Sequence, residues 1–118
     1  MSAETALRAT LVAHTATAAL VGQRVRAERA EQDDVRPFVI FTRTASEPYN
    51  TVDGAVLATL VSLDVQCWAD TRTGADALAD AVSAAIRAVP TQSVAGRSSG
   101  YDADLDLEVT NLNILWWE

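Results

Sequence analysis

The sequence contains no lysine: its nine basic residues are all arginines, set against sixteen aspartates and glutamates. Without lysine the chain cannot form a P-loop with its phosphate-binding lysine, a Schiff-base nucleophile or a lysine general base. The net charge of −7 also argues against a duplex-binding surface, because such a surface needs a basic patch. These absences exclude lysine-dependent enzymes and disfavour a sequence-reading DNA-binding protein.

Histidine and cysteine occur once each, as His14 and Cys67. A metal cluster of histidines and cysteines therefore cannot be assembled, and an internal disulfide is impossible. His14 falls on a predicted helix face at the margin of the core. Cys67 lies between apolar residues in mid-strand, where a nucleophilic thiolate is disfavoured. Glycine-rich phosphate loops and carboxylate pairs with hydrolase spacing are also missing. We expect neither an enzyme nor a metal or cofactor site.

Long apolar runs are missing as well. None reaches the length that spans a membrane, and the first residues lack the basic-then-apolar layout of a signal peptide. A chain of 118 residues makes one domain that can bury about two-thirds of its unfolded surface without disulfides. We therefore expect a soluble, intracellular single-domain protein that does not contact a membrane.

The clearest pattern is a strand that leads directly into a helix. Apolar residues alternate with polar ones from Leu57 to Ala69, which predicts a half-buried strand. The period then changes to helical spacing, which predicts a helix over residues 73–89 that Pro90 ends. A strand followed by a helix that packs back on its sheet indicates an α+β fold.

The first half of the chain predicts a helix and the other strand of a hairpin. Apolar residues at helical spacing predict a helix over residues 3–21, with Gly22 after its end. Residues 24–36 read as charged and irregular. Phe38–Arg43 is rich in strand formers, and the turn-forming residues of 44–56 predict a long loop before the next strand. This hairpin over residues 37–69 has one arm of roughly 40 Å, so its tip should project.

Residues 91–117 are expected to form the terminal strands of a mostly antiparallel sheet with two helices packed on it. We expect a short strand at Thr91–Ala95, a flexible turn at Gly96–Gly100 and a long strand at Leu105–Trp117. A change of apolar register predicts a bulge near Asn111. The adjacent residues Trp116 and Trp117 should be docked on the sheet or buried against another subunit.

An acidic series precedes this last strand and begins like a calcium-binding EF-hand loop. The loop needs glycine at its sixth position and a bidentate glutamate at its twelfth, but Leu107 and Asn113 stand there. Calcium binding is therefore not expected. If this segment is a strand, its carboxylates share one face of the sheet. That face would either be solvated or form the acidic wall of a channel. The series comprises Asp102, Asp104, Asp106 and Glu108.

The order of features along nearly the whole chain resembles a known family. It begins with an amphipathic helix, continues through short apolar and turn segments, and is most specific at the strand-to-helix segment around Trp68. The matching segments are Leu7–Gly22, Arg24-Val25, Arg36–Phe41, Ser46–Pro48, Asp53-Gly54, Leu63–Asp70, Ala77–Val82 and Leu112–Trp117. In this order they resemble the tail completion, or head–tail joining, proteins of long-tailed bacteriophages, which are related to tail terminators. Residues 91–105 are shorter than the corresponding region of that family.

The resemblance implies a structural virion protein, assembled in the host cytoplasm, that forms a six-membered ring at the head-proximal end of the tail tube. Its implied partners are further copies of itself, the tail tube protein and head connector or stopper proteins, while DNA passes through without specific binding. An acidic chain suits such a conduit. The interface candidates are Glu47, Pro48, Tyr49, Asn50, Asp53, Trp116 and Trp117, and the channel-lining candidates are Asp102, Asp104 and Asp106.

Two other classes fit the composition. A small adaptor domain would bind a peptide at the exposed edge of its sheet, and it would remain monomeric. A small-molecule-binding α+β domain would need a deep pocket with converging polar groups, with Trp68 and His14 as its nearest candidates. The virion interpretation alone accounts for the order of features along the chain.

Overall fold

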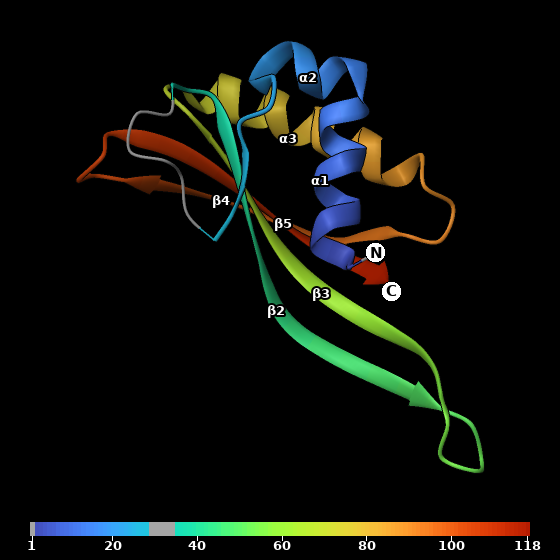
Figure 1. The fold of residues 1–118 in the computed structure, drawn as a ribbon. Coiled ribbons are helices and arrows are strands. Elements are labelled where there is room, and N and C mark those ends of the chain that lie inside the picture. Colours follow the sequence, from blue (N-terminus) through green and yellow to red (C-terminus); the bar gives the residue numbers. More distant parts are fainter. Residues whose placement is uncertain (1, 29–34) are drawn as a thin grey trace.

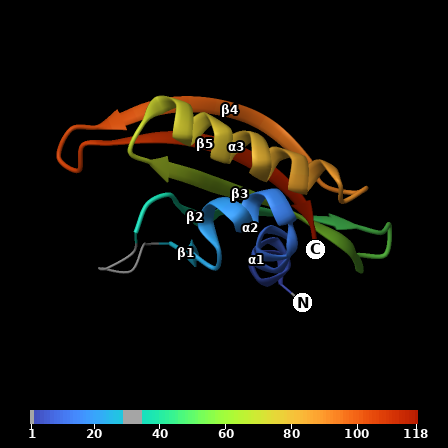
Figure 2. The same cartoon turned by 90° about the horizontal axis from the view of Figure 1, so that it is seen from above.

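In the part of the chain that the structure describes, three helices cover one face of a twisted five-stranded sheet and no helix covers the other (Figures 1 and 2). The computed structural model describes residues 2–28 and 35–118. The strand order is β1-β2-β3-β5-β4, with β1 parallel to β2 and all other neighbours antiparallel. The elements are α1 (Ala3–Ala13), α2 (Thr15–Val21), β1 (Val25–Ala27), β2 (Phe38–Asn50), β3 (Val56–Ala69), α3 (Arg72–Arg87), β4 (Ser93–Asp102) and β5 (Leu107–Trp117). The α+β fold is confirmed.

The helix predicted over residues 3–21 is wrong as one continuous element, because it divides at His14 into α1 and α2. His14 adopts an extended backbone, and its Nδ1 accepts a hydrogen bond from the Thr17 backbone N–H at 3.4 Å. A side chain that caps a new helix competes with continuing the old one. The helix layer therefore has three members instead of two, while Gly22 ends α2 as expected, at a positive φ of 58°.

The central hairpin is longer than the sequence predicted. Strand β2 does not end at Arg43 but continues to Asn50, so the expected loop over residues 44–56 shrinks to the turn at 51–55. Pro48 is compatible with this strand because it pairs with Thr59, whose carbonyl already accepts from the Glu118 N–H. The nitrogen of Pro48 therefore points away from β3, where no ladder bond is lost.

The outer half of this hairpin, residues 45–60, extends beyond the helices and is called the arm below (Figure 1). A register shift between Arg43 and Ala45 marks its base, as a β-bulge does where a strand bends. The molecule is elongated, with principal-axis extents of 52 × 29 × 24 Å. The expected projecting hairpin is present.

The C-terminal hairpin differs from the prediction in three places. Residues 96–100 lie within β4 and are not a turn, and the turn is at 103–106 instead. The register between β3 and β5 is continuous from Leu60↔Trp117 to Ala69↔Glu108, so no bulge occurs at Asn111. The apolar pattern changes near Asn111 because the two halves of β5 bury opposite faces. Leu112, Ile114 and Trp116 face the helices, whereas Leu107 belongs to a separate, smaller apolar cluster.

Most of the apolar core lies between the sheet and the helices. Its largest fully buried side chains are Leu7, Leu11, Leu63, Leu78, Ile86, Leu112 and Ile114. A smaller cluster joins Phe38, Ile40, Leu107 and Trp68, with the rings of Phe38 and Trp68 6.3 Å apart. The pairing register places this cluster on the face of the sheet that the helices leave open.

Cys67 lies in the main core with no exposed surface. Burial disfavours the thiolate and raises the pKa of Cys67 to about 12, from an ordinary value of 9.0. Because three pKa units correspond to about a thousandfold less thiolate and the thiol has no exposed surface, we expect the native protein to react with maleimide at least about a thousand times more slowly than the unfolded chain. Labelling with and without denaturant, followed by mass spectrometry, measures this ratio. A native rate within tenfold of the unfolded rate would show that the thiol is accessible.

Candidate functional site

The described residues contain no group of three or more histidine, cysteine, aspartate or glutamate side chains arranged to hold a metal ion. Within the same part of the chain, no helix is long and apolar enough to cross a membrane. His14 caps α2 through its Nδ1, and Cys67 is buried in the core. The exposed side chains of the described residues are candidates for contacts with other molecules.

The arm carries four of the nine large apolar side chains that are exposed among the described residues. Val52 at its tip is fully exposed, and Val56 and Leu57 keep 62% and 72% of their surface accessible. Of the interface candidates, Glu47, Pro48, Tyr49 and Asn50 lie in the β2 strand of the arm, and Asp53 lies in its turn. In that turn the Thr51 hydroxyl donates to Asp53, and this bond is the main cause of a lowered pKa of Asp53. The sequence-predicted residues are therefore brought together on one projecting element.

The two C-terminal tryptophans point to opposite faces of the sheet. Trp116 is buried in the core below the helices, at 5% exposure. This position does not fit the predicted interface role of Trp116. Trp117 is 40% exposed and packs against Tyr49 of the arm, with ring centroids 5.1 Å apart. Trp117 and Tyr49 together therefore offer an aromatic surface to another molecule.

An ion cluster fixes the base of the arm. Arg43 lies next to the bulge, and its guanidinium contacts Glu4 of α1 at 2.5 Å and Glu118 at 2.7 Å. It also donates to the Ser46 hydroxyl on the arm side of the bulge, at 2.8 Å. The Glu118 carboxylate accepts in addition from the Ala3 backbone N–H, and this bond, followed by that from Arg43, lowers the pKa of Glu118. The cluster ties α1, the last residue and the arm into one unit.

Of the channel-lining candidates, Asp102 is the last residue of β4, and Asp104 and Asp106 lie in the turn before β5. The expectation that they share one strand face is wrong, because the chain reverses between Asp102 and Leu107. Asp102 accepts hydrogen bonds from the backbone N–H groups of Asp104 and Leu105, at 3.0 and 3.1 Å. Asp106 has a positive φ of 52° and accepts from the Tyr101 hydroxyl at 2.5 Å. Aspartates of this kind stabilise tight turns.

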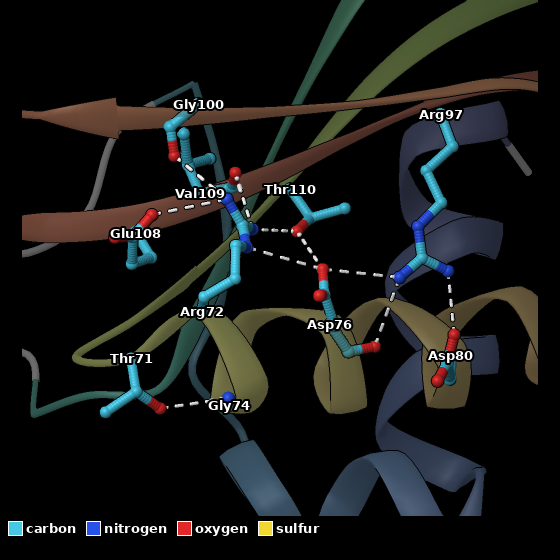
Figure 3. Close-up of polar contacts among 10 residues, drawn as sticks. All are labelled: Thr71, Arg72, Gly74, Asp76, Asp80, Arg97, Gly100, Glu108, Val109 and Thr110. Carbon is cyan, nitrogen blue, oxygen red and sulfur yellow. Dashed lines mark hydrogen bonds and ion pairs between the residues drawn. The ribbon is translucent and has the colours of Figure 1, made fainter.

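Arg72 at the start of α3 anchors the same hairpin to the helix layer (Figure 3). Its guanidinium donates to the carbonyls of Gly100 and Val109, to Glu108 and to the Thr110 hydroxyl. Arg97 of β4 also contacts α3, where its guanidinium lies 2.7 Å from the Asp80 carboxylate (Figure 3). These contacts join β4 and β5 to α3.

Asp64 lies on the open face of the sheet, between Thr42 of β2 and Asn113 of β5. Partial burial disfavours its charge and raises the pKa of Asp64. The native state therefore holds this proton to higher pH than the unfolded chain, so the ionised carboxylate destabilises the fold at neutral pH.

Asp64→Asn is accordingly expected to raise the free energy of unfolding at pH 7, by about 0.5 kcal/mol, as is usual for a partly exposed site. The gain should vanish below about pH 4, where Asp64 is protonated in both states. Urea unfolding at pH 7 and pH 3 measures both values. A loss of stability at pH 7 would contradict this account of Asp64.

Two comparisons relate this chain to known proteins, and a third found no match. The family model described as Tail completion protein gp17 matches residues 5–118. A chain from a structure titled "Virion of native gene transfer agent (GTA) particle" superposes with a TM-score of 0.74, at 17% sequence identity. That alignment covers 97% of this chain and 92% of the other, so the two share a fold over nearly their whole lengths. No curated protein sequence matches the chain.

Proposed function

Because the chain belongs to the tail completion protein gp17 family and is thus a structural component of phage-like virions, we propose that it closes the head-proximal end of a tail tube as a six-membered ring. In this position the ring would terminate the tube and present its other surface to the head connector. The observation that carries the proposal is the arm, which projects from the body of the subunit and ends in exposed valine and leucine side chains.

A closed ring requires each subunit to offer two different surfaces that fit each other, because its contacts are head-to-tail. The arm supplies one such surface, with Tyr49 packed against Trp117 and Val52 at its tip. Exposed aromatic and apolar side chains at this density are typical of interface centres and rare on free surfaces. We propose that the arm of each subunit lies on the body of the next, and that the Arg43 cluster sets its direction.

The acidic turn is proposed to face the channel. Asp102, Asp104 and Asp106 make no ion pair among the described residues, and their contacts are with backbone N–H groups or a tyrosine hydroxyl. Carboxylates whose charge is not neutralised by an ion pair repel the phosphates of a passing DNA duplex and keep it from binding to the channel wall. In this proposal the ring guides DNA without recognising its sequence.

The experiment that tests the ring is the solution mass across a wide range of protein concentration, with negative-stain images of the same samples. The proposal expects closed rings of six subunits at the upper concentrations, in equilibrium with smaller species. Tail tubes are then added to samples that remain below the ring threshold, because a tube end can raise the local concentration of subunits. Open filaments, or particles without rotational symmetry in both samples, would overturn it.

A further inference from the structure

The outer edge of β4 is a long unpaired strand. It forms one side of the sheet, and no described element lies beyond it (Figure 2). Soluble proteins usually protect such an edge with lysine, proline or an outward charge. Strand β4 contains no lysine and no proline, and its one arginine, Arg97, is turned to Asp80 on the helix side. The arm edge, by contrast, is protected by the outward nitrogen of Pro48.

The backbone pattern identifies which groups this edge exposes. The Glu118 N–H bonds to the Thr59 carbonyl, and the β3–β5 register then continues without a shift. Along an antiparallel strand, successive residues direct their backbone N–H and C=O groups to opposite neighbours. Since Glu118 bonds to β3, Val109 and Asn111 direct their backbone groups to β4, where they pair with Gly100 and Ser98. The alternate residues of β4 therefore direct their N–H and C=O groups outward. These are Arg97, Ser99 and Tyr101.

This edge is complementary to itself. If two β4 strands align antiparallel about a two-fold axis at Ser99, Arg97 of one faces Tyr101 of the other, and every outward donor meets an outward acceptor. On the open face, Ser98 then lies opposite Gly100 and Gly96 lies opposite Asp102. No two like charges are opposed. Arg97, whose guanidinium is held by Asp80, lies opposite Tyr101 of the second copy, a pair without like charges.

We propose that two copies of this chain pair their β4 strands around Ser99, which joins their sheets into one continuous sheet. Small side chains at Gly96, Ser98 and Gly100 leave the backbone accessible to the second strand. A regular run from Gly96 to Asp102, after the register shift at Ala95, is available for the pairing.

This contact is separate from the ring. It is the same patch on both copies and closes on itself, so it produces a dimer and cannot propagate around a six-membered ring. Its occupant is a second copy of the free protein, and its effect is to cover an edge that otherwise invites non-specific strand addition. Its failure leaves the ring proposal unchanged, and failure of the ring leaves the dimer unchanged.

Single cysteine variants test the two-fold register. Ser99→Cys would place two thiols opposite each other in a paired position, where the Cα separation of about 5.5 Å is compatible with a disulfide. Ser98→Cys is the matched control, because its thiol would face glycine in the second copy. With oxidised glutathione, Ser99→Cys should form a covalent dimer at least about tenfold faster than Ser98→Cys. Equal rates, or no dimer from Ser99→Cys, would overturn the register. Cys67 is buried and does not interfere.

A proline variant tests the strand pairing itself. Ser99→Pro removes an outward N–H and leaves the bonds between β4 and β5 in place, so the subunit should keep its circular dichroism spectrum. Its self-association, measured by sedimentation, should weaken at least about tenfold, equivalent to 1.4 kcal/mol. A Ser99→Pro protein that dimerises like the parent would show that the edge is not the contact.

Discussion

Replacing Trp116 with alanine is expected to lower the free energy of unfolding by about 3–5 kcal/mol, the cost of truncating a large aromatic side chain in a core. Trp116 is almost fully buried and packs in the main apolar cluster below the helices. A loss of this size is a large fraction of the stability of an ordinary domain. Urea unfolding followed by circular dichroism measures it.

The matched control is Trp117→Ala, one residue further along the chain. Trp117 is half-exposed and loses its ring contact with Tyr49, which is worth about 1 kcal/mol. The two tryptophans thus separate folding from assembly: Trp116→Ala destabilises the subunit, and Trp117→Ala leaves it folded but weakens the ring. Equal losses of stability in the two variants would contradict the placement of Trp116 in the core and Trp117 at the surface.

An arm variant is expected to show the largest effect on assembly. Replacing Val52, Val56 and Leu57 together by serine changes side chains that are mostly exposed, so stability should change by only about 0.5 kcal/mol per site. If the arm is the centre of the subunit contact, losing an anchor costs about 2 kcal/mol or more, which weakens each contact at least about thirtyfold. Rings should then be missing at concentrations where the parent forms them.

Serine substitutions of Leu20 and Val35 provide the control for this variant. Both residues are exposed apolar side chains outside the arm, at 38% and 63% exposure. Their double variant should form rings like the parent, which would show that loss of apolar surface alone is not the cause. Rings that persist in the arm variant would mean that the arm contacts something other than the neighbouring subunit.

The sequence predicted the elements whose periodicity is strong. Alternation from Leu57 to Ala69 and the helical spacing after it correspond to β3 and α3, because each element buries one regular face. The errors occur where turn-forming residues lie in strands. Pro48 and Asn50 signal a loop in isolation, as do Gly96 and Gly100. Pairing with β3 and β5 overrides those local preferences, since a strand at the edge of a sheet tolerates both proline and glycine.

The site could be predicted only in part, for a related reason. The arm and Trp117 were identified from local cues: turn residues between two strands and an aromatic pair in the last strand. The Arg43 cluster was missed because its partners Glu4 and Glu118 lie 39 and 75 positions away in the sequence. The self-complementary edge was missed because Gly96–Gly100 was interpreted as a turn. In both cases the missing information was the strand order, which periodicity does not contain.

Capping of tail tubes tests the central claim most directly. Purified tubes of the tube protein are mixed with gold-labelled subunits and imaged by negative stain, with the arm variant as a parallel sample. The account predicts label at one end of each tube, in particles with six-fold end views, and no further growth of capped tubes when more tube protein is added. The arm variant should leave the ends bare. Label along the sides of the tubes, or tubes that keep growing with labelled ends, would contradict the assignment as a ring that terminates the tail.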